Sequence, residues 1–365
     1  MRVFIVTNDF WNLVNFRKPL LKELTKKNFE LIILTNLKKK NKLQKIKNIK
    51  LHHINFKSNF NFINDLINYF FIFLFCIKYK PKIILNFTIK PVLLCSFIGK
   101  LLNIKCINTI TGFGNLYLKS NLFKKCFLIS YKLFTSQKNY FFFHNKVDYK
   151  YFLNNRISQK SKSFITMGSG VNLSIFNNLK PKLKKKINFL MISRLIYNKG
   201  VIEFLEAVKL LRKNNNLYFK LLGREIDDNL NEIKKSQLSK YSSLKNLKIL
   251  NFSKNVKGEL KDTNFVILPS YREGMPKSLM EAISSGIPVI ASNVVGNSDL
   301  VLENVNGFLC RPQNNRSLYN VILKVSKIKK QKYNLLSKNC RKYAEYYLDE
   351  NKVTHKYLTL IKKII

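Results

Sequence analysis

Residues 265–293 read FVILPSYREGMPKSLMEAISSGIPVIASN, and this stretch contains two short apolar runs that flank a polar loop and an amphipathic segment. The pattern predicts a strand over Phe265–Leu268, a helix that begins at Pro276 and ends before Gly286, and a second strand over residues 289–291. A strand, a helix and a strand so close together make a βαβ unit, which requires parallel strands and a right-handed crossover. The chain is therefore expected to be an α/β protein built on parallel sheets.

Two carboxylates lie where such a unit binds ligands, which is outside the carboxyl ends of the strands and beside helix N-termini. Glu273 is in the loop after the first strand, and Glu281 is eight residues further on, within the predicted helix. Together with a helix N-terminus they predict a pocket for a phosphorylated, hydroxyl-rich ligand. The alternatives are structural, because Glu273 could serve only the helix dipole and Glu281 could serve only an ion pair with Lys277.

A pair of cations occupies an equivalent position upstream. Arg194 and Lys199 follow a predicted strand over residues 187–192 and precede a predicted helix over residues 201–211. At this turn an arginine fork and a lysine point charge can converge on a diphosphate. The chain has 66 lysines and arginines, so the pair is also consistent with ordinary surface charge.

The alternation of predicted strands and helices restarts after a polar, basic stretch. We expect a first Rossmann-like domain over residues 1–170, a linker over 171–186, a second Rossmann-like domain over 187–347, and a last helical segment, 348–365, that packs back toward the first domain. Residues 8–12 are expected to form a loop, residues 16–24 a helix, and residues 227–240 a longer helix. No G-x-G-x-x-G motif follows the first strand, which argues against a dinucleotide cofactor.

Charge is distributed unevenly along the chain. Residues 1–180 carry 31 lysines and arginines and 5 carboxylates, whereas residues 181–365 carry 35 and 15. The basic first half predicts an anionic partner, either a membrane surface or nucleic acid, although a lysine-loaded surface is the simple alternative. The aromatic residues interleaved with it, at 69–75 and at 123, 127, 131 and 134, suit a lipid-facing surface or an ordinary core.

Several classes of protein are disfavoured by the sequence. The six cysteines lack metal-like spacing and suggest reduced core thiols in a cytosolic protein. The longest apolar run, residues 66–77, is too short to span a bilayer, and the immediate strand at residues 2–6 argues against a signal peptide. We expect no metal site, and no module typical of nucleic-acid-binding proteins is visible.

The motif Glu273-x7-Glu281, with ISRLIYNKGVIEFLEA at residues 192–207, resembles the C-terminal half of the retaining glycosyltransferases of family 4, which adopt the GT-B fold. Weaker similarity covers NFRKPLLKEL at 15–24, FTIKPVLLCSFIGKLL at 87–102 and INTITGFGNLY at 107–117. These segments resemble family members that build polyprenyl-diphosphate-linked glycans or polysaccharide repeat units. The resemblance implies two doubly wound domains that face a central cleft.

The same resemblance implies roles for individual residues. Arg194 and Lys199 would bind the donor diphosphate, and Glu273 would contact the transferred sugar, so that these three carry catalysis. Glu281 would bind the ribose. The other implied donor-binding residues are Gly223, Gly274, Met275, Pro276 and Lys277. The implied acceptor-side residues are Asn15, Arg17, Thr111, Gly112 and Gly114. His144, at the end of a predicted strand, is a further acceptor-side candidate, although a satisfied strand-end histidine is the simpler interpretation.

The implied reaction moves a hexosyl or N-acetylhexosaminyl group from a nucleotide sugar, expected to be a UDP-sugar, to a glycan acceptor with retention and without a metal ion. No cofactor is implied beyond the nucleotide-sugar substrate. The expected setting is lipopolysaccharide or capsule synthesis, by a cytoplasmic protein associated peripherally with the inner face of the membrane. Alternatives are an epimerase-like or phosphorylase-like enzyme of the same fold, a non-catalytic relative, or a basic nucleic-acid-binding protein.

Overall fold

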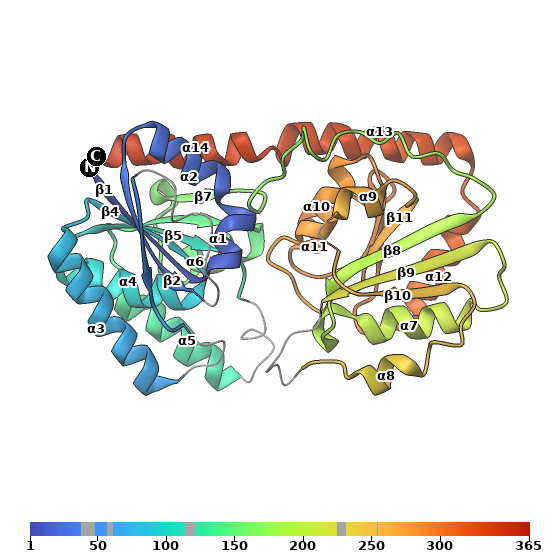
Figure 1. Cartoon of the computed structure of the whole chain (residues 1–365), viewed down its shortest axis with the longest axis horizontal. Coiled ribbons are helices and arrows are strands. Elements are labelled where there is room, and N and C mark those ends of the chain that lie inside the picture. Colours follow the sequence, from blue (N-terminus) through green and yellow to red (C-terminus); the bar gives the residue numbers. More distant parts are fainter. Residues whose placement is uncertain (38–47, 57–60, 114–120, 225–230, 254) are drawn as a thin grey trace. The chain divides into compact units, whose positions relative to one another are not determined.

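The computed structural model describes residues 1–37, 48–56, 61–113, 121–224, 231–253 and 255–365. The chain forms two compact units, which are drawn in Figure 1. Unit 1 comprises Met1–Gly170 and Glu350–Ile365, and unit 2 comprises Val171–Asp349. Each unit is an α/β structure with its own sheet.

Unit 1 contains, within its described residues, a parallel sheet of seven strands in the order β3-β2-β1-β4-β5-β6-β7. The strands are β1 (Arg2–Asp9), β2 (Glu30–Asn36), β3 (Ile49–His53), β4 (Ile83–Phe87), β5 (Lys105–Ile110), β6 (Tyr140–Phe143) and β7 (Ser163–Ile165). The helices are α1 (Phe10–Phe16), α2 (Lys18–Lys26), α3 (Phe62–Tyr79), α4 (Ile89–Leu101), α5 (Asn121–Phe134), α6 (Lys146–Asn154) and α14 (Glu350–Ile364), with a 3₁₀ turn at Lys160–Lys162.

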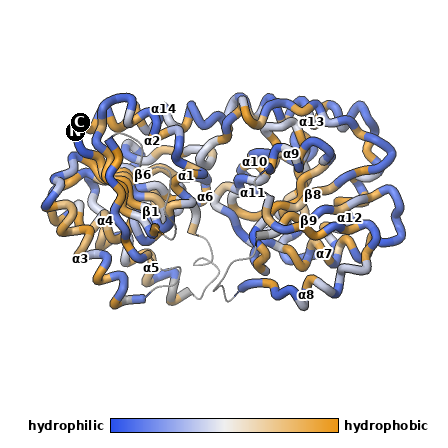
Figure 2. Tube along the Cα trace, viewed as in Figure 1, coloured by the Kyte–Doolittle hydropathy of each residue, from blue (hydrophilic) through white to orange (hydrophobic). Residues whose placement is uncertain are grey.

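The sheet of unit 1 is buried on both faces, as parallel sheets require. Side chains alternate along β1, so that Val3 and Ile5 face α1, α2 and α14, whereas Phe4 and Val6 face α3 and α4. The apolar strands accordingly form the hydrophobic centre of this unit in Figure 2. Because both faces need covering, nearly every strand residue is apolar, and the period-2 signal is weak.

The start of the chain differs from the expected loop and single helix. β1 continues to Asp9, and α1 begins at Phe10 because the Asp9 carboxylate accepts a hydrogen bond from the Asn12 backbone N–H at 2.7 Å. The helix stops at Arg17, and α2 begins at once, with Pro19 in its first turn. The predicted loop at 8–12 was therefore wrong, and the predicted helix at 16–24 is divided at Arg17.

Unit 2 contains, among the residues described, a parallel sheet of six strands in the order β10-β9-β8-β11-β12-β13. The strands are β8 (Ile187–Arg194), β9 (Leu217–Arg224), β10 (Leu247–Leu250), β11 (Phe265–Leu268), β12 (Val289–Ser292) and β13 (Gly307–Cys310). The helices are α7 (Val201–Leu210), α8 (Lys235–Ser239), α9 (Val256–Leu260), α10 (Lys277–Ser284), α11 (Asn297–Leu300), α12 (Asn315–Ser326) and α13 (Lys330–Tyr347), with a 3₁₀ turn at Tyr197–Lys199.

The predicted βαβ unit is present as β11, α10 and β12. Pro276 caps α10, and Gly286 follows its end with a φ of 77°, a conformation that favours glycine. The predicted helix over 227–240 was wrong. Residues 225–230 lie outside the described part, and Tyr197 and Ile233 instead donate backbone hydrogen bonds to Asn231 and Leu195, so only α8 remains helical.

The last helix, α14, belongs to unit 1, where its apolar side joins the core beside α2. Its Tyr357 hydroxyl lies 2.7 Å from the Thr109 Oγ1 of β5. All six cysteines are free thiols, and Cys126 is the exposed one. Among the described residues, no helix combines the length and apolar character that a membrane crossing needs.

We predict that Ile361→Ala lowers the free energy of unfolding of unit 1 by about 2–4 kcal/mol, because Ile361 is fully packed in the core through α14. The neighbouring exposed Lys362→Ala serves as the control, with an expected change below about 0.5 kcal/mol. Chemical denaturation followed by the fluorescence of Trp11, the sole tryptophan, measures both. Equal stability of the two variants would show that α14 does not support unit 1.

Candidate functional site

The loops that follow β8 and β11 meet at the carboxyl end of the sheet in unit 2. Gly200 has a φ of 71°, and a Cβ on it would lie 2.0 Å from the Pro269 carbonyl oxygen. The Tyr271 N–H also donates to the Asn198 carbonyl at 2.9 Å. The two loops are therefore locked together at a distance that only glycine permits at position 200.

This contact brings Lys199 and Glu273 into an ion pair. The Lys199 Nζ lies 2.6 Å from the Glu273 Oε1, and the two side chains are 19% and 9% exposed. A carboxylate so deeply buried is retained only when it is paired. Two of the predicted catalytic residues, which are 74 positions apart in the sequence, thus contact each other.

A buried polar network supports the Glu273 loop. The Asn297 Nδ2 donates to the carbonyl of Ser292 at 3.1 Å and lies 3.3 Å from the Ser270 Oγ, while the Ser292 hydroxyl donates to the Ser270 carbonyl. On the other side, the Glu273 N–H donates to the Val295 carbonyl at 3.1 Å. Sequence reasoning missed Ser270, Ser292 and Asn297, because hydrogen bonds between separate strands leave no periodic signal.

Tyr271 fixes the same loop to α7. Its hydroxyl donates to the Glu203 Oε1 at 2.6 Å, and burial together with the Glu203 charge raises the pKa of Tyr271. Glu203 was not predicted to matter. Glu203 lies in the first turn of α7, three residues after Gly200, and its carboxylate anchors Tyr271. It therefore influences Glu273 only by fixing the loop in which Glu273 lies.

Glu281 lies on α10 and is partly buried. Burial raises the pKa of its carboxyl to about 7, although the nearby Lys277 opposes the shift. Near neutral pH the group can therefore either accept or donate a hydrogen bond, which suits contact with sugar hydroxyls. No hydrogen bond from another described side chain to the Glu281 carboxylate is present.

Arg194 ends β8 and is exposed, without an ion pair or a side-chain hydrogen bond to any described residue. Gly223, on the neighbouring strand β9, has a packing role, since a Cβ there would lie 2.3 Å from a methyl carbon of Leu195. The remaining predicted donor residues, Gly274, Met275, Pro276 and Lys277, run from the Glu273 loop into the first turn of α10. The predicted donor residues thus cluster on β8, β9 and α10 of one sheet edge.

In unit 1 the structure brings together two of the predicted acceptor-side residues. The buried Arg17 guanidinium lies 3.3 Å from the His144 Nε2 and 4.4 Å from the centre of the Phe87 ring. Burial, together with the Arg17 charge, holds the pKa of His144 well below its usual range, so the neutral imidazole accepts the hydrogen bond. The pocket beside Arg17 offers about 10 Å³, which is room for one water molecule.

The other acceptor-side residues do not join this pair. Asn15 is exposed on α1, where its side chain donates to the Trp11 carbonyl at 2.8 Å. Thr111 and Gly112 follow β5 and are partly buried, and Gly114 lies outside the described residues. In the described part of the chain, no group of three His, Cys, Asp or Glu side chains lies close enough to hold a metal ion.

A family model described as "Glycosyl transferases group 1" matches residues 175–345. These residues form a group 1 glycosyltransferase domain. The domain contains β8 to β13 and every predicted donor residue, and it confirms the expectation of a glycosyltransferase. The match does not distinguish family 4 from the rest of the group.

Two relatives of this chain are informative. One, from Escherichia coli, is named UDP-Gal:alpha-D-GlcNAc-diphosphoundecaprenol alpha-1,3-galactosyltransferase, and it is 33% identical over 156 residues, which are 42% of this chain and 39% of that protein. The other, from Campylobacter jejuni, is named N,N'-diacetylbacillosaminyl-diphospho-undecaprenol alpha-1,3-N-acetylgalactosaminyltransferase. It is 27% identical over 272 residues, which are 70% of each chain.

Solved structures confirm the GT-B fold over the whole chain. A glycosyltransferase from Rickettsia africae has a TM-score of 0.76 and 20% identity, and covers 100% of this chain and 98% of its own. The Anabaena HepE protein, solved with UDP and glucose, has a TM-score of 0.78 and 15% identity, with complete coverage of both chains. At these identities the likeness establishes the fold.

We predict that Glu281→Gln changes the pH dependence of stability. Between pH 4.5 and about 7 the folded protein retains a proton that the unfolded chain has lost, so this carboxyl makes stability fall as the pH rises through that window. The variant should therefore melt at a higher temperature than the wild type at pH 8, and this advantage should disappear at pH 4.

Thermal unfolding of both proteins at the two pH values measures the effect. The exposed Asp262→Asn, on the same unit, is the control and should show no comparable gain at pH 8. An equal difference between Glu281→Gln and the wild type at both pH values would contradict the assigned pKa.

Proposed function

We propose that the protein transfers a sugar from a nucleotide-sugar donor, a UDP-sugar, to a glycan linked to polyprenyl diphosphate. The observation that carries this proposal is the Lys199–Glu273 ion pair at the carboxyl edge of a group 1 glycosyltransferase domain, with Glu281 on the adjacent helix. The names of the E. coli and C. jejuni relatives support the acceptor, since each contains a diphosphate-linked undecaprenol.

Binding of the donor exchanges the partner of Lys199. In the free protein the Lys199 ammonium neutralises Glu273, and in the complex it bonds the donor diphosphate, where charge accumulates as the sugar departs. Arg194, exposed and without a described partner, supplies a second cation, and the first turn of α10 adds a favourable dipole. These groups provide the positive charge for a metal-independent transfer.

The same exchange prepares the sugar side of the site. When Lys199 binds the donor diphosphate, the Glu273 carboxylate loses its ion-pair partner. It then accepts hydrogen bonds from hydroxyls of the transferred hexosyl or N-acetylhexosaminyl group. Glu281 bonds the ribose, as carboxylates do in other nucleotide folds. The acceptor attacks from the face that the diphosphate leaves, which gives retention without an enzymic nucleophile.

Unit 1 supplies the acceptor side. Asn15, Thr111 and Gly112 are the predicted acceptor-side residues that a ligand can reach. Arg17 and His144 are buried and contact each other at the carboxyl edge of the sheet. An acceptor could reach Arg17 only if the one-water pocket opened. We assign Arg17 and His144 a positioning role.

The polyprenyl acceptor defines where the enzyme works. We propose a cytoplasmic protein that associates peripherally with the inner face of the membrane and builds a surface polysaccharide of the lipopolysaccharide or capsule type. A net charge of +46 supports attraction to anionic lipid. The capsule and amylovoran glycosyltransferases among its relatives support the same setting.

We predict that the purified protein slowly hydrolyses one member of a UDP-sugar panel and that Lys199→Ala and Arg194→Ala each reduce this turnover by about 10²-fold or more, since each removes a charge opposite the leaving diphosphate. Arg212→Ala and Lys213→Ala, which change exposed cations of the same unit, are the matched controls and should retain full turnover.

Product analysis separates the proposal from the epimerase-like alternative. A transferase releases free UDP, whereas an epimerase returns an isomer that is still linked to the nucleotide or a different free sugar. Unchanged turnover in both Lys199→Ala and Arg194→Ala would remove the proposed donor site.

A further inference from the structure

Three helices form a continuous layer over one face of the sheet in unit 1. The ring of Phe97, on α4, lies 5.6 Å from that of Tyr69 on α3 and 5.1 Å from that of Phe134 on α5, measured between centroids. These aromatic contacts hold α3, α4 and α5 side by side. The layer thus has one inner surface on the sheet and one outer surface in solvent.

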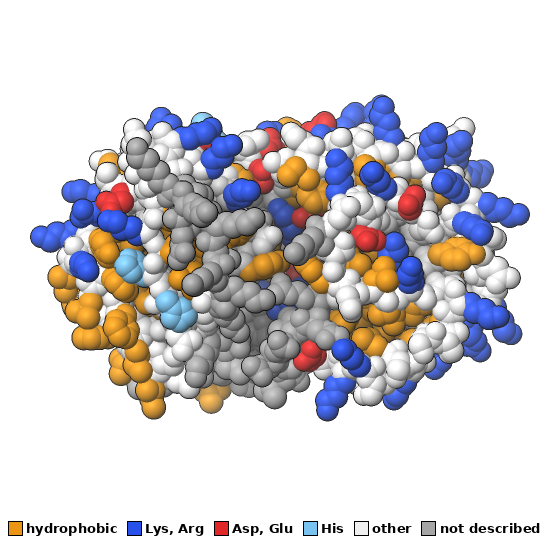
Figure 3. All heavy atoms as spheres, in the orientation of Figure 1, with side chains coloured by type: hydrophobic (Ala, Val, Ile, Leu, Met, Phe, Trp, Pro, Cys, Tyr) orange, Lys and Arg blue, Asp and Glu red, His pale blue; other side chains and the backbone are white. Residues whose placement is uncertain are grey.

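α3 presents a second apolar stripe on that outer surface. Its inner side is already satisfied, with Ile72 and Cys76 buried against the sheet. Seven further large apolar side chains, each at least 42% exposed, recur at helical spacings of three and four residues: Ile63, Leu66, Ile67, Phe70, Phe71, Leu74 and Ile77. Figure 3 shows hydrophobic side chains gathered over α3 at the lower left. Such a pattern normally marks a buried helix face.

The apolar surface extends beyond α3 along the same layer. The additional exposed side chains are Leu101 at the end of α4 and Leu122, Ile129 and Leu133 on α5. Several large apolar side chains exposed on one layer of helices mark an interaction site. The eleven side chains together define what we call the α3–α5 face.

The charge around the α3–α5 face has one sign. Residues 62–138 contain eleven lysines and a single carboxylate, Asp65. That carboxylate is neutralised by Lys90, whose Nζ lies 2.8 Å from its Oδ1. The exposed lysines among the described residues of this region are Lys78, Lys80, Lys82, Lys100, Lys105, Lys125, Lys132 and Lys138. Apolar side chains rimmed by lysines complement an anionic lipid surface.

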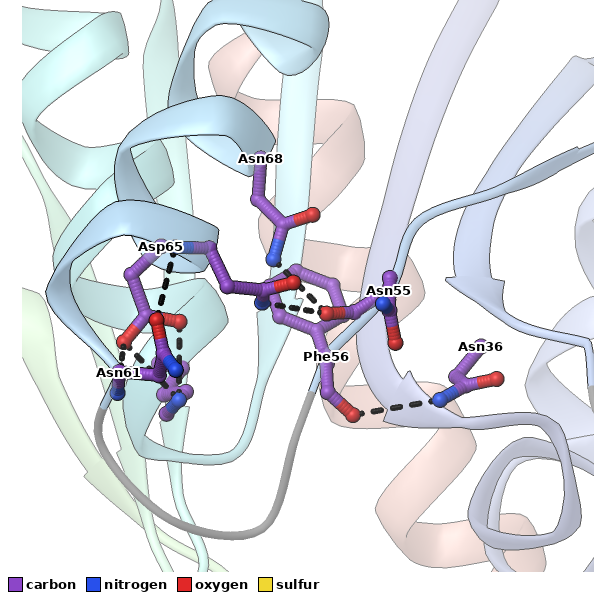
Figure 4. Close-up of polar contacts among 8 residues, drawn as sticks. Asn36, Asn55, Phe56, Asn61, Asp65 and Asn68 are labelled. Carbon is purple, nitrogen blue, oxygen red and sulfur yellow. Dashed lines mark hydrogen bonds and ion pairs between the residues drawn. The ribbon is translucent and has the colours of Figure 1, made fainter.

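Polar contacts fix α3 to unit 1 independently of its outer stripe. Asn61 caps the helix by accepting from the Asn64 N–H at 3.0 Å, and the side chains of Asn64 and Asn68 both donate to the Asn55 carbonyl. Figure 4 shows Asn61, Asp65 and Asn68 together with Asn55. The exposed apolar residues are therefore not needed to hold α3 in place.

We propose that the α3–α5 face docks the protein onto an anionic bilayer, with α3 lying along the surface of the membrane. The inference rests on the proposed function, because a polyprenyl-linked acceptor must be reached from the membrane. α3 and α5 follow β3 and β5, so their first turns lie at the carboxyl edge of the sheet, where Thr111 and Gly112 stand. Ile63 and Leu122, in those first turns, are 71% and 72% exposed. Docking brings the acceptor edge of unit 1 to the lipid.

The test measures flotation of the full-length chain with vesicles of phosphatidylcholine alone or mixed with phosphatidylglycerol. Wild type should float with the anionic vesicles, and 1 M salt should weaken the binding without abolishing it, because the apolar contribution is not screened. The triple variant Leu66→Ser, Phe70→Ser and Leu74→Ser should lower the partition coefficient roughly tenfold or more.

A matched triple variant, Ile175→Ser, Leu335→Ser and Tyr346→Ser, removes exposed apolar side chains from unit 2 and should bind like wild type. Trp11 lies in unit 1, so its fluorescence during denaturation confirms that the α3 triple variant is folded, and circular dichroism checks the folding of the unit 2 variant. Equal flotation of the two triple variants, or no flotation of wild type, overturns the proposal. Sedimentation showing a dimer that only the α3 triple variant dissociates, without vesicle binding, would assign the face to a second copy of the chain.

Donor hydrolysis in solution separates this inference from the proposed function. The α3 triple variant should hydrolyse the donor at the wild-type rate while losing transfer to a lipid-linked acceptor in vesicles. Flotation without any donor turnover in wild type would contradict the proposed function and leave the docking surface standing.

Discussion

The close approach of Gly200 to the Pro269 carbonyl is the constraint on which the second unit's site depends. Any side chain at position 200 would push apart the loops after β8 and β11. Those loops carry Lys199 and Glu273, whose charges meet at 2.6 Å only because the backbones touch. A pair this short and this buried cannot be formed by flexible surface side chains, since ordering them would cost most of what the contact returns.

Further hydrogen bonds fix the loop that carries Glu273, and so they hold the Lys199–Glu273 ion pair in place. Tyr271 is fixed to Glu203 of α7, and the Ser270–Ser292–Asn297 network fixes the same loop to β12 and α11. These contacts fix the residues that precede Glu273, and the Glu273 N–H itself donates to the Val295 carbonyl. The carboxyl of Glu281 is the exception, because burial raises its pKa to about 7 and no described side chain hydrogen-bonds it. A carboxyl that is buried without a hydrogen-bond partner lowers the stability of the free protein, and such a group is expected where a ligand supplies the missing hydrogen bond.

The parts of the fold that could be predicted from the sequence are those set by local chemistry. Pro276 and Gly286 delimit α10 because one fixes φ and the other adopts a positive φ, and both effects act within a single turn. The failed prediction over 227–240 has a non-local cause. Ile233 donates its N–H to the Leu195 carbonyl, and this pairing with the loop after β8 replaces the helix. Gly223 likewise makes room for Leu195, a packing role that its position at a strand end did not reveal.

The same limit applies to α3, which carries apolar residues both on the side that meets the sheet and on the opposite side. Periodicity identifies a stripe but cannot say whether it meets the sheet or the solvent, and the structure divides the aromatic run accordingly. Tyr69, Phe73 and Phe75 pack inward, whereas Phe70 and Phe71 face out. On α5 the core alternative holds for three of the aromatics, since Tyr131 is buried and Phe127 and Phe134 pack partly buried against it, whereas aliphatic neighbours are exposed. The fourth, Phe123, lies outside the described side chains.

Only the polar residues distinguish the two sides of α3. Asn64, Asp65 and Asn68 bond the body of unit 1, and they recur at the same helical spacing as the buried Ile72 and Cys76. A helix anchored by hydrogen bonds at its first turns does not need further apolar burial there, so its outer stripe is free for another surface. Because the anchor lies at the carboxyl edge of the sheet, a lipid surface bound by that stripe would be held at a fixed distance from the acceptor side.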